Sequence, residues 1–295
     1  CSIKFMKLIR SPREVSKILL RLRGAGKRIG FVPTMGAFHE GHLSLIRRAA
    51  KESDVVVASI FVNPAQFGPR EDFRRYPRNL RRDQSLLKRA RVDYLFVPSR
   101  VSIYPAHFRK WIQPGPIVRY LCGPKRPGHF RGVATVVNRL FEIVKPHTAY
   151  FGEKDYQQAR IIEDMVRRLQ LPVRIRTCPI VRERDGLAMS SRNRYLTRKE
   201  RILARSIYQS LRYGRRLIRS GERSVSKVKR AMKKILISRV DQIDYIQILD
   251  PKKCAPLKRI RLPVLLAVAS YVGSTRLIDN LLIYLWIVLY QIFLG

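Results

Sequence analysis

Two histidines three residues apart lie in a glycine-containing turn, within the sequence PTMGAFHEGH at residues 33–42. Apolar residues at helical spacing follow it, and a helix N-terminus offers free N–H groups and a positive dipole end to phosphate. Gly36 and Gly41 would let the backbone approach such a ligand closely. Near a bound phosphate, His39 or His42 could carry a proton and stabilise its charge. A turn with two exposed histidines, or a pair of metal ligands, would give the same pattern.

Two side-chain amides follow the next apolar run, in the sequence IFVNPAQFG at residues 60–68. Amides orient a carboxylate or a hydroxyl without adding charge, so Asn63 and Gln66 are candidate substrate contacts. Taken alone, simple turn chemistry explains this motif better.

Charged residues open a helical pattern in the sequence FGEKDYQQ at residues 151–158. Lys154 could bind a polyphosphate as a point charge. Asp155 is a candidate Mg²⁺ ligand, although a residue of this type at a helix start also serves as an N-cap.

Two hydroxyls and a guanidinium stand together in the sequence DGLAMSSRN at residues 185–193. Ser190, Ser191 and Arg192 have the donors of a neutral-plus-cationic phosphate clamp. The alternative is a serine-rich cap before the helix that is expected to begin near residue 197.

Strand and helix patterns alternate up to about residue 180. Apolar runs predict buried strands, and apolar residues at helical spacing predict the helices between them. The expected strands are 28–34, 54–62, 93–97, 148–151 and 173–178, and the expected helices are 13–23, 41–53, 80–91, 133–144 and 156–169. This order predicts an α/β fold with a Rossmann-like, doubly wound parallel sheet over residues 1–181, whose ligands would lie at the carboxyl ends of the strands.

The pattern changes after residue 181. Residues 198–219 and 225–239 read as basic amphipathic helices, and residues 243–249 and 264–272 read as strands. We therefore expect a second, smaller α+β domain over residues 182–280.

Residues 281–295 are uncharged and strongly apolar. As a helix they would span about 22 Å, which is shorter than a bilayer core of about 30 Å. We therefore expect no transmembrane span. Interfacial attachment, a buried oligomer contact and a non-native extension all fit the composition, and we expect this tail to lie outside the catalytic fold.

The charge balance is strongly positive: 61 Lys and Arg against 21 Asp and Glu give a formal net charge of +40 over 295 residues. Such an excess favours nucleic acid, anionic membranes or polyphosphate substrates as partners. The basic residues are spread along the chain, whereas a nucleic-acid tail is usually one block. We interpret the excess as a general basic bias, with any nucleic-acid binding non-specific.

The four cysteines at positions 1, 122, 178 and 254 lack metal-ligand spacing, which predicts reduced thiols and a cytoplasmic protein. Residues 1–10 lack the apolar segment of a secretory signal. The sequence begins with Cys1, so a true start at Met6 and a fragment of a longer chain both remain open.

Together and in this order, the motifs resemble the pantothenate synthetase family, which belongs to the HxGH-type nucleotidyltransferases. The matching stretches are PTMGAFHEGHLSLIRRA, SIFVNPAQFGPREDFRRYPR, GHFRGVATVVNRLFEIVKPHTAYFGEKDYQQ, RERDGLAMSSRN and GSTRLIDN. The resemblance extends over about residues 6–280. Phe38 stands where that family usually has Leu, and Ala65 where Thr is commoner; both changes leave the polar groups in place.

The resemblance implies an ATP-dependent condensation of pantoate with β-alanine that gives pantothenate, AMP and diphosphate through a pantoyl adenylate, with Mg²⁺ accompanying ATP. It also implies a homodimer. By the same resemblance, Gln66 contacts pantoate and β-alanine, Gln158 contacts pantoate, and Asn63 supports the same substrate pocket.

The catalytic set implied by the resemblance is His42 as proton donor with His39, Lys154 and Arg192. Asp155 is the implied Mg²⁺ ligand. The implied ATP contacts are Met35, Gly36, Ala37, Phe38, His39, Glu40, Gly41, His42, Gly152, Glu153, Lys154, Asp155, Val181, Met189, Ser190, Ser191 and Arg192.

Two other functions remain as alternatives. A nucleotidyltransferase that transfers AMP or CMP to a phosphorylated acceptor would share the histidine motif, but the NPAQF loop and Gln158 argue against it. An RNA-binding protein that kept an enzyme fold would explain the charge, but few aromatic residues interleave the basic patches.

Overall fold

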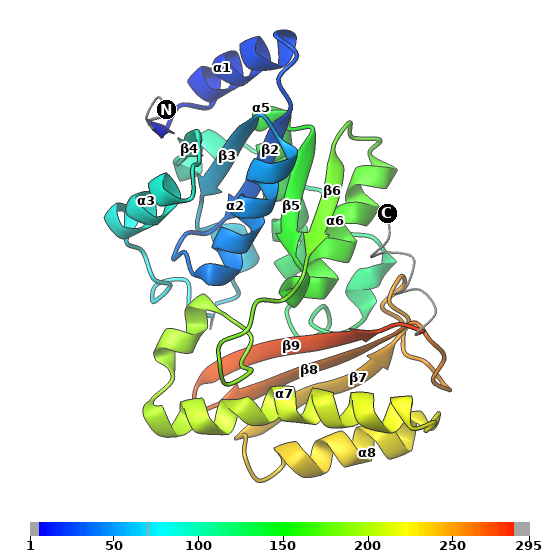
Figure 1. Ribbon diagram of the computed structural model, residues 1–295. Helices are drawn as coiled ribbons and strands as arrows, with labels where there is room; N and C mark the ends of the chain where they lie inside the picture. The colour runs from blue at the N-terminus through cyan, green and yellow to red at the C-terminus, as the bar shows by residue number, and fades with distance from the viewer. Residues whose placement is uncertain (1–5, 70, 286–295) are drawn as a thin grey trace. The chain divides into compact units, whose positions relative to one another are not determined.

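A computed structural model describes residues 6–69 and 71–285 of the chain. It forms two compact units (Figure 1). The first comprises the described residues before Arg119 together with Cys122–Glu153 and Gln158–Val181. The second comprises Arg119–Leu121, Lys154–Gln157 and the described residues from Arg182 onward.

A six-stranded parallel sheet forms the centre of the first unit, in the order β1-β4-β3-β2-β5-β6. The α/β fold class is therefore confirmed. The chain adds β3 on one side of β2 and later β5 on the other, so the strand order reverses between β2 and β5. Their bounds are β1 Lys7–Ile9, β2 Ile29–Thr34, β3 Val55–Ile60, β4 Tyr94–Phe96, β5 Thr148–Gly152 and β6 Arg174–Cys178.

Helices cover both faces of this sheet because the apolar strands are buried on both sides. Side chains of β2 and β3 alternate between two cores: Phe31 and Val57 pack with α1, α5 and α6, while Val32 and Val56 pack with α2 and α3. The helix bounds are α1 Pro12–Gly24, α2 Glu40–Glu52, α3 Leu80–Arg89, α4 Arg100–Ile103, α5 His129–Val144 and α6 Tyr156–Arg168, with 3₁₀ turns η1 Pro64–Gln66, η2 Pro116–Arg119 and η3 Glu153–Asp155.

The second unit has an antiparallel sheet in the order β7-β8-β9, and α7 and α8 pack together along one face of it (Figure 1). The apolar stripes of both helices join the sheet in one core. Gly214 of α7 allows this close packing, since a Cβ there would lie 2.8 Å from the Met232 sulfur. The bounds are η4 Ser191–Tyr195, α7 Arg198–Arg219, α8 Val225–Leu236, β7 Gln242–Leu249, β8 Val264–Val272 and β9 Thr275–Ile283.

The expectation that residues 281–295 lie wholly outside the fold was wrong at its start. Leu281, Leu282 and Ile283 form the end of β9 and pair with Leu266, Leu265 and Val264 of β8. Their apolar character therefore belongs to a sheet, and the remaining residues 286–295 lie outside the described part of the chain. In residues 6–69 and 71–285, no helix has the length and apolarity needed to cross a membrane.

His147 joins β2 to β5 by an unusual side-chain contact that generates a prediction. The Ile29 N–H donates to His147 Nδ1 at 2.9 Å, so this nitrogen must be unprotonated. Burial, with the Arg23 and Arg28 guanidiniums, lowers the pKa of His147 below its usual 6.5. The associated stability is therefore complete above pH 6.5 and falls as the pH drops towards the lower folded-state pKa.

We expect His147→Asn, whose side-chain oxygen can still accept from Ile29 but does not titrate, to show a flatter stability profile between pH 7 and pH 5. The wild-type protein should lose about 1 kcal/mol more over this range, the usual worth of one hydrogen bond. Urea unfolding at several pH values measures both profiles. Parallel profiles would contradict the role of this imidazole.

Candidate active site

The loop that follows β2 is held by a buried carboxylate. Asp83 of α3 is 2% exposed. It accepts the N–H groups of Ala37 at 2.8 Å and Phe38 at 3.0 Å. Gly36 and Ala37 have φ angles of 79° and 52°, so the loop turns through the left-handed region and needs this support. A Cβ on Gly36 would also lie 2.9 Å from Asp83 Oδ2.

This arrangement changes the expected roles of two residues. The N–H groups of Ala37 and Phe38 point at Asp83, and the Phe38 side chain is fully buried in the core between α2 and the sheet. The structure therefore does not support a direct ATP contact through either N–H group or through the Phe38 ring. Both residues shape the loop on which the histidines stand.

His39 and His42 lie side by side at the start of α2. Their ring centroids are 4.0 Å apart with an interplanar angle of 31°. His39 is the N-cap residue, and its carbonyl accepts the N–H of His42 at 2.9 Å. The buried Phe38 ring lies 5.4 Å from His42 in an edge-on contact and supports it from the core side. The helix N-terminus therefore presents both imidazoles together, with Glu40 beside them paired to Arg47.

The NPAQF loop after β3 brings Gln66 to the loop after β2. Gln66 Nε2 lies 3.3 Å from the Met35 sulfur, and Asn63 Nδ2 donates to Gln66 Oε1 at 3.1 Å. Asn63 is 1% exposed, and its amide also donates to Gly132 O and accepts from the Tyr104 hydroxyl at 2.8 Å. Burial raises the pKa of Tyr104, so its hydroxyl stays neutral and donates. Asn63 thus orients the Gln66 side chain, and its role in a substrate pocket stays a prediction.

Helix α5 fixes the same loop through its backbone and its first turn. A Cβ on Gly132 would lie 2.1 Å from Ala65 O, so only glycine lets α5 approach η1 this closely. His129 Nδ1 lies 2.7 Å from the Gln66 carbonyl, which can only accept, and Arg126 Nη1 lies 2.9 Å from His129 Nε2. This pattern assigns the proton of a neutral His129 to Nδ1. Arg126 also pairs with Glu71.

The end of β5 lies beside the end of β2 in the sheet. Gly152 ends β5, and Glu153 follows in η3. Burial raises the pKa of Glu153. Gln158 is half-buried in the first turn of α6, and Val181 ends the first unit. Three adjacent strands, β3, β2 and β5, are therefore followed by the predicted contacts of the first unit, except Val181, which follows β6.

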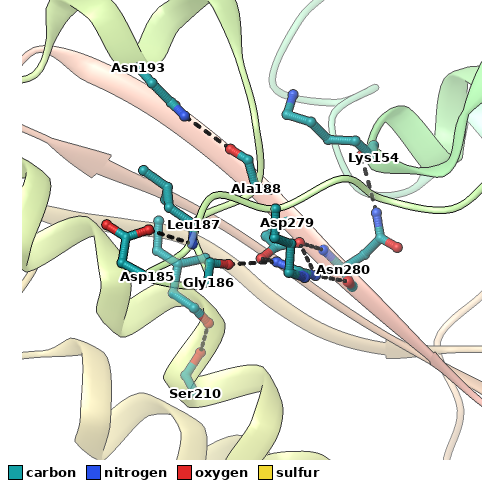
Figure 2. A network of polar contacts seen from close by, with 11 residues as sticks. Lys154, Asp185, Gly186, Leu187, Ala188, Asn193, Ser210, Asp279 and Asn280 are labelled. Atoms are coloured by element: carbon teal, nitrogen blue, oxygen red, sulfur yellow. Dashed lines mark hydrogen bonds and ion pairs between the residues drawn. The ribbon is translucent and has the colours of Figure 1, made fainter. Parts of the chain in front are cut away.

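The remaining predicted residues belong to the second unit. Lys154 Nζ lies 3.8 Å from Asp155 Oδ1, and half of the Asp155 side chain is exposed. In the loop that follows residue 182, Ser190 Oγ accepts the N–H of Arg192 at 3.3 Å as the cap of η4, and Met189 precedes it. Asn193 braces this loop by donating to Ala188 O at 3.1 Å (Figure 2). Ser190 therefore caps η4 and Thr197 caps α7, while the phosphate clamp stays a prediction.

Sequence reasoning missed the residues that position the site. Asp83, Tyr104, Arg126 and His129 lie up to 63 residues from the backbone or side chains they hold. The only local signal was Asp83, an acidic residue among the arginines of α3. Within the described ranges, no group of three or more His, Cys, Asp or Glu residues could hold a metal ion.

We expect Asp83→Asn to lower the free energy of unfolding by about 2 kcal/mol, because its NH₂ group would face a backbone N–H that loses its acceptor. Amide exchange at Ala37 and Phe38 should accelerate as the loop loosens. Asp54→Asn is the control, since Asp54 accepts one backbone N–H, from Arg28, at an exposed site. Equal costs for both variants, with unchanged exchange at Ala37 and Phe38, would contradict this role of Asp83.

Comparisons with known proteins agree over nearly the whole chain. The pantoate-beta-alanine ligase family model matches residues 7–282. A pantothenate synthetase of Thermotoga petrophila is 53% identical over 277 residues, covering 93% of this chain and 99% of the relative. One of Moorella thermoacetica is 51% identical over 279 residues, covering 94% and 99%.

Solved structures give the same result. A pantothenate synthetase of Thermus thermophilus superposes with a TM-score of 0.90 at 45% identity, covering 95% of this chain and all of that chain. A pantoate-beta-alanine ligase of Francisella tularensis, crystallised with beta-gamma ATP and beta-alanine, has a TM-score of 0.78 at 37% identity, covering 94% and 98%. On this agreement of sequence, fold and motif order, the chain belongs to the pantoate-beta-alanine ligase family.

Proposed function

We propose that this protein joins pantoate to β-alanine at the expense of ATP, giving pantothenate, AMP and diphosphate. The observation that carries the proposal is that two groups meet where the adjacent strands β2 and β3 end. The paired imidazoles of His39 and His42 stand at a helix N-terminus, and the Gln66 amide contacts Met35 at the base of the same loop. The phosphates of a nucleotide need the imidazoles and the helix N-terminus, and a hydroxy acid needs the amide.

The reaction needs two steps because a carboxylate is a poor acylating agent. In the first, a pantoate carboxylate oxygen attacks the α-phosphorus, and the bond from that phosphorus to the bridging oxygen breaks, releasing diphosphate. In the second, the β-alanine nitrogen attacks the acyl carbon, loses a proton and releases AMP. The first transition state gathers negative charge on the phosphates, so fixed donors around them lower its energy by several kcal/mol.

We assign the donors to residues of both units. His42, with His39 beside it, supplies a proton or a positive charge to the phosphates, while Lys154 and Arg192 supply permanent positive charge. The nucleotide contacts extend over the loops at Met35 to His42, Gly152 to Asp155 and Met189 to Arg192, with Val181 adjacent. Ala37 and Phe38 contribute through the shape of the loop.

Substrate recognition is assigned to side-chain amides. Gln66 is already oriented by Asn63, which fixes its oxygen as acceptor and leaves its NH₂ group directed towards Met35. Such a group can donate to a carboxylate or hydroxyl without the charge that would compete with the phosphates. Gln158, at the start of α6, is the proposed second contact to pantoate.

Mg²⁺ is proposed to accompany ATP. Mg²⁺ commonly binds through one or two carboxylates together with substrate phosphates, so it does not need a cluster of protein ligands. Asp155 fits this use, because its carboxylate is half exposed and stands next to the Lys154 ammonium. When bound, the ion would neutralise phosphate charge.

We also propose a cytoplasmic homodimer. Cys122, Cys178 and Cys254 are buried and form no disulfide among the described residues, which suits a reducing compartment. Light scattering of the purified protein tests the dimer. A version ending at Leu285 tests residues 286–295, since an earlier end at Asn280 would remove paired residues of β9.

The activity is tested by measuring AMP release with each substrate omitted in turn. AMP should appear only when ATP, pantoate and β-alanine are all present. A dinucleotide product would instead favour the other nucleotidyltransferase reaction, and AMP release without β-alanine would contradict the proposal. Sequence-selective RNA binding without ATP turnover would favour the RNA-binding alternative.

We expect His42→Ala and Lys154→Ala each to slow diphosphate release by about two orders of magnitude or more, as the loss of a phosphate-stabilising donor does. His107→Ala and Lys51→Ala are matched controls, because both side chains are exposed in the first unit away from the proposed contacts. Single-turnover diphosphate release with ATP and pantoate isolates the first step. Near-normal rates in both test variants would show that the site is misplaced.

A further inference from the structure

Two neighbouring residues in the middle of β9 hold the two segments that carry the proposed cations of the second unit. Asp279 contacts Arg182, the first residue of the loop that leads to Arg192. Asn280 contacts the backbone of Lys154 (Figure 2). Both β9 residues are about 5% exposed or less, so water competes little for these contacts.

The contact between Arg182 and Asp279 is a bidentate ion pair. Arg182 Nη1 and Nη2 donate to the two carboxylate oxygens of Asp279 at 2.6 and 3.0 Å. The same guanidinium donates to Gly186 O at 3.1 Å and lies 3.8 Å from the centre of the Tyr208 ring. Arg182 also forms an isolated antiparallel bridge with Ala188. The turn between residues 182 and 188 is therefore fixed to β9 and α7 at once.

That turn is continuous with the loop that contains Arg192. Asn193 Nδ2 donates to Ala188 O at 3.1 Å and to Glu183 Oε1 at 2.9 Å. Glu183 is in turn paired with Arg201 of α7. The residues on both sides of the Met189–Arg192 stretch, Ala188 and Asn193, are thus bonded to the turn between residues 182 and 188 that Asp279 fixes.

The second contact fixes the lysine segment to the same strand. Asn280 Nδ2 donates to Lys154 O at 3.1 Å. Tyr156 adds a hydroxyl bond to Pro251 O at 3.0 Å, and Gln157 donates to Tyr120 O at 2.6 Å. The short segment Lys154–Gln157 therefore belongs to the second unit although the chain on both sides of it belongs to the first.

A buried ion pair is weak evidence for stability, because desolvation offsets much of its attraction and a well-packed apolar pair is often as stable. However, the two hydrogen bonds from the Arg182 guanidinium fix its direction and distance relative to the Asp279 carboxylate. We propose that Asp279 and Asn280 are positioning residues that hold Lys154 and the Arg192 loop at a set spacing for one triphosphate. The inference rests on the proposed function.

The same sheet contains a matched ion pair without this connection. Arg276 Nη2 lies 2.6 Å from Asp244 Oδ2, with side-chain exposures of 18% and 6% against 17% and 3% for the Arg182–Asp279 pair. Arg276 also faces a tyrosine ring, that of Tyr245. Asp244→Asn therefore reproduces the chemistry and burial of Asp279→Asn at a place that holds neither cationic segment.

The test is a double-mutant cycle on diphosphate release. Asn280→Ala should slow this step about tenfold or more in the wild-type background, since a small misplacement of a catalytic group has such effects. In the Lys154→Ala background the same substitution should change the rate less than about twofold, because the group it positions is gone. Arg182→Lys keeps the charge but loses the two-bonded guanidinium. It should slow diphosphate release about tenfold or more in the wild-type background and less than about twofold in the Arg192→Ala background.

Melting temperatures separate positioning from a general loss of stability. Asp279→Asn and Asp244→Asn should lower the melting temperature comparably, yet only Asp279→Asn should slow diphosphate release. Equal slowing by both, or the same slowing by Asn280→Ala in both backgrounds, would overturn the inference while leaving the proposed function intact. Normal diphosphate release by Lys154→Ala itself would instead overturn the assignment of Lys154 in the proposed function.

Discussion

The parallel pairing of β2 with both β3 and β5 is the constraint on which the rest of the first unit depends. Parallel strands end at the same edge of a sheet, so three loops far apart in the sequence must meet there. Where these loops meet, strained backbone lies next to polar side chains, and each loop needs its own support. Asp83 holds the first loop, and Tyr104 with the first turn of α5 holds the second.

The strongly basic composition makes the few carboxylates informative. With 21 acidic residues against 61 basic ones, opposite charge is scarce, and several acids bond to the groups that shape the site. Asp83 accepts backbone N–H groups, Glu71 pairs with Arg126, and Asp279 pairs with Arg182. Burial opposes ionisation of Glu71, but the hydrogen bonds and charge of Arg126 outweigh it and lower the pKa. Two arginines near the proposed contacts, Arg126 and Arg182, are therefore positioned by carboxylates.

The sequence predicted the elements whose apolar pattern is strong and missed those whose pattern is interrupted. The strand at 264–272 was predicted with the bounds it has, because nine apolar or small residues follow one another. Strand β9 was missed because Asp279 and Asn280 interrupt it, and β1 because three residues give no period. The site motifs were found because they follow predicted strands directly and because their order along the chain resembles that of a known family. The residues that hold these motifs in place were not found, because Asp83 or Tyr104 acquires a role only when the chain folds back over tens of residues.

The interruption of β9 has a physical reason that links fold to function. Polar residues in the buried part of a strand cost desolvation energy, which only well-formed hydrogen bonds offset. Asp279 and Asn280 have such bonds, and their partners, Arg182 and Lys154, are the first residues of two of the three segments that form the second unit. An apolar strand would have packed as well against α7 but could not have fixed these segments. The residues that hid the strand from sequence analysis are thus the ones that fix the segments of Arg182 and Lys154 to the small sheet.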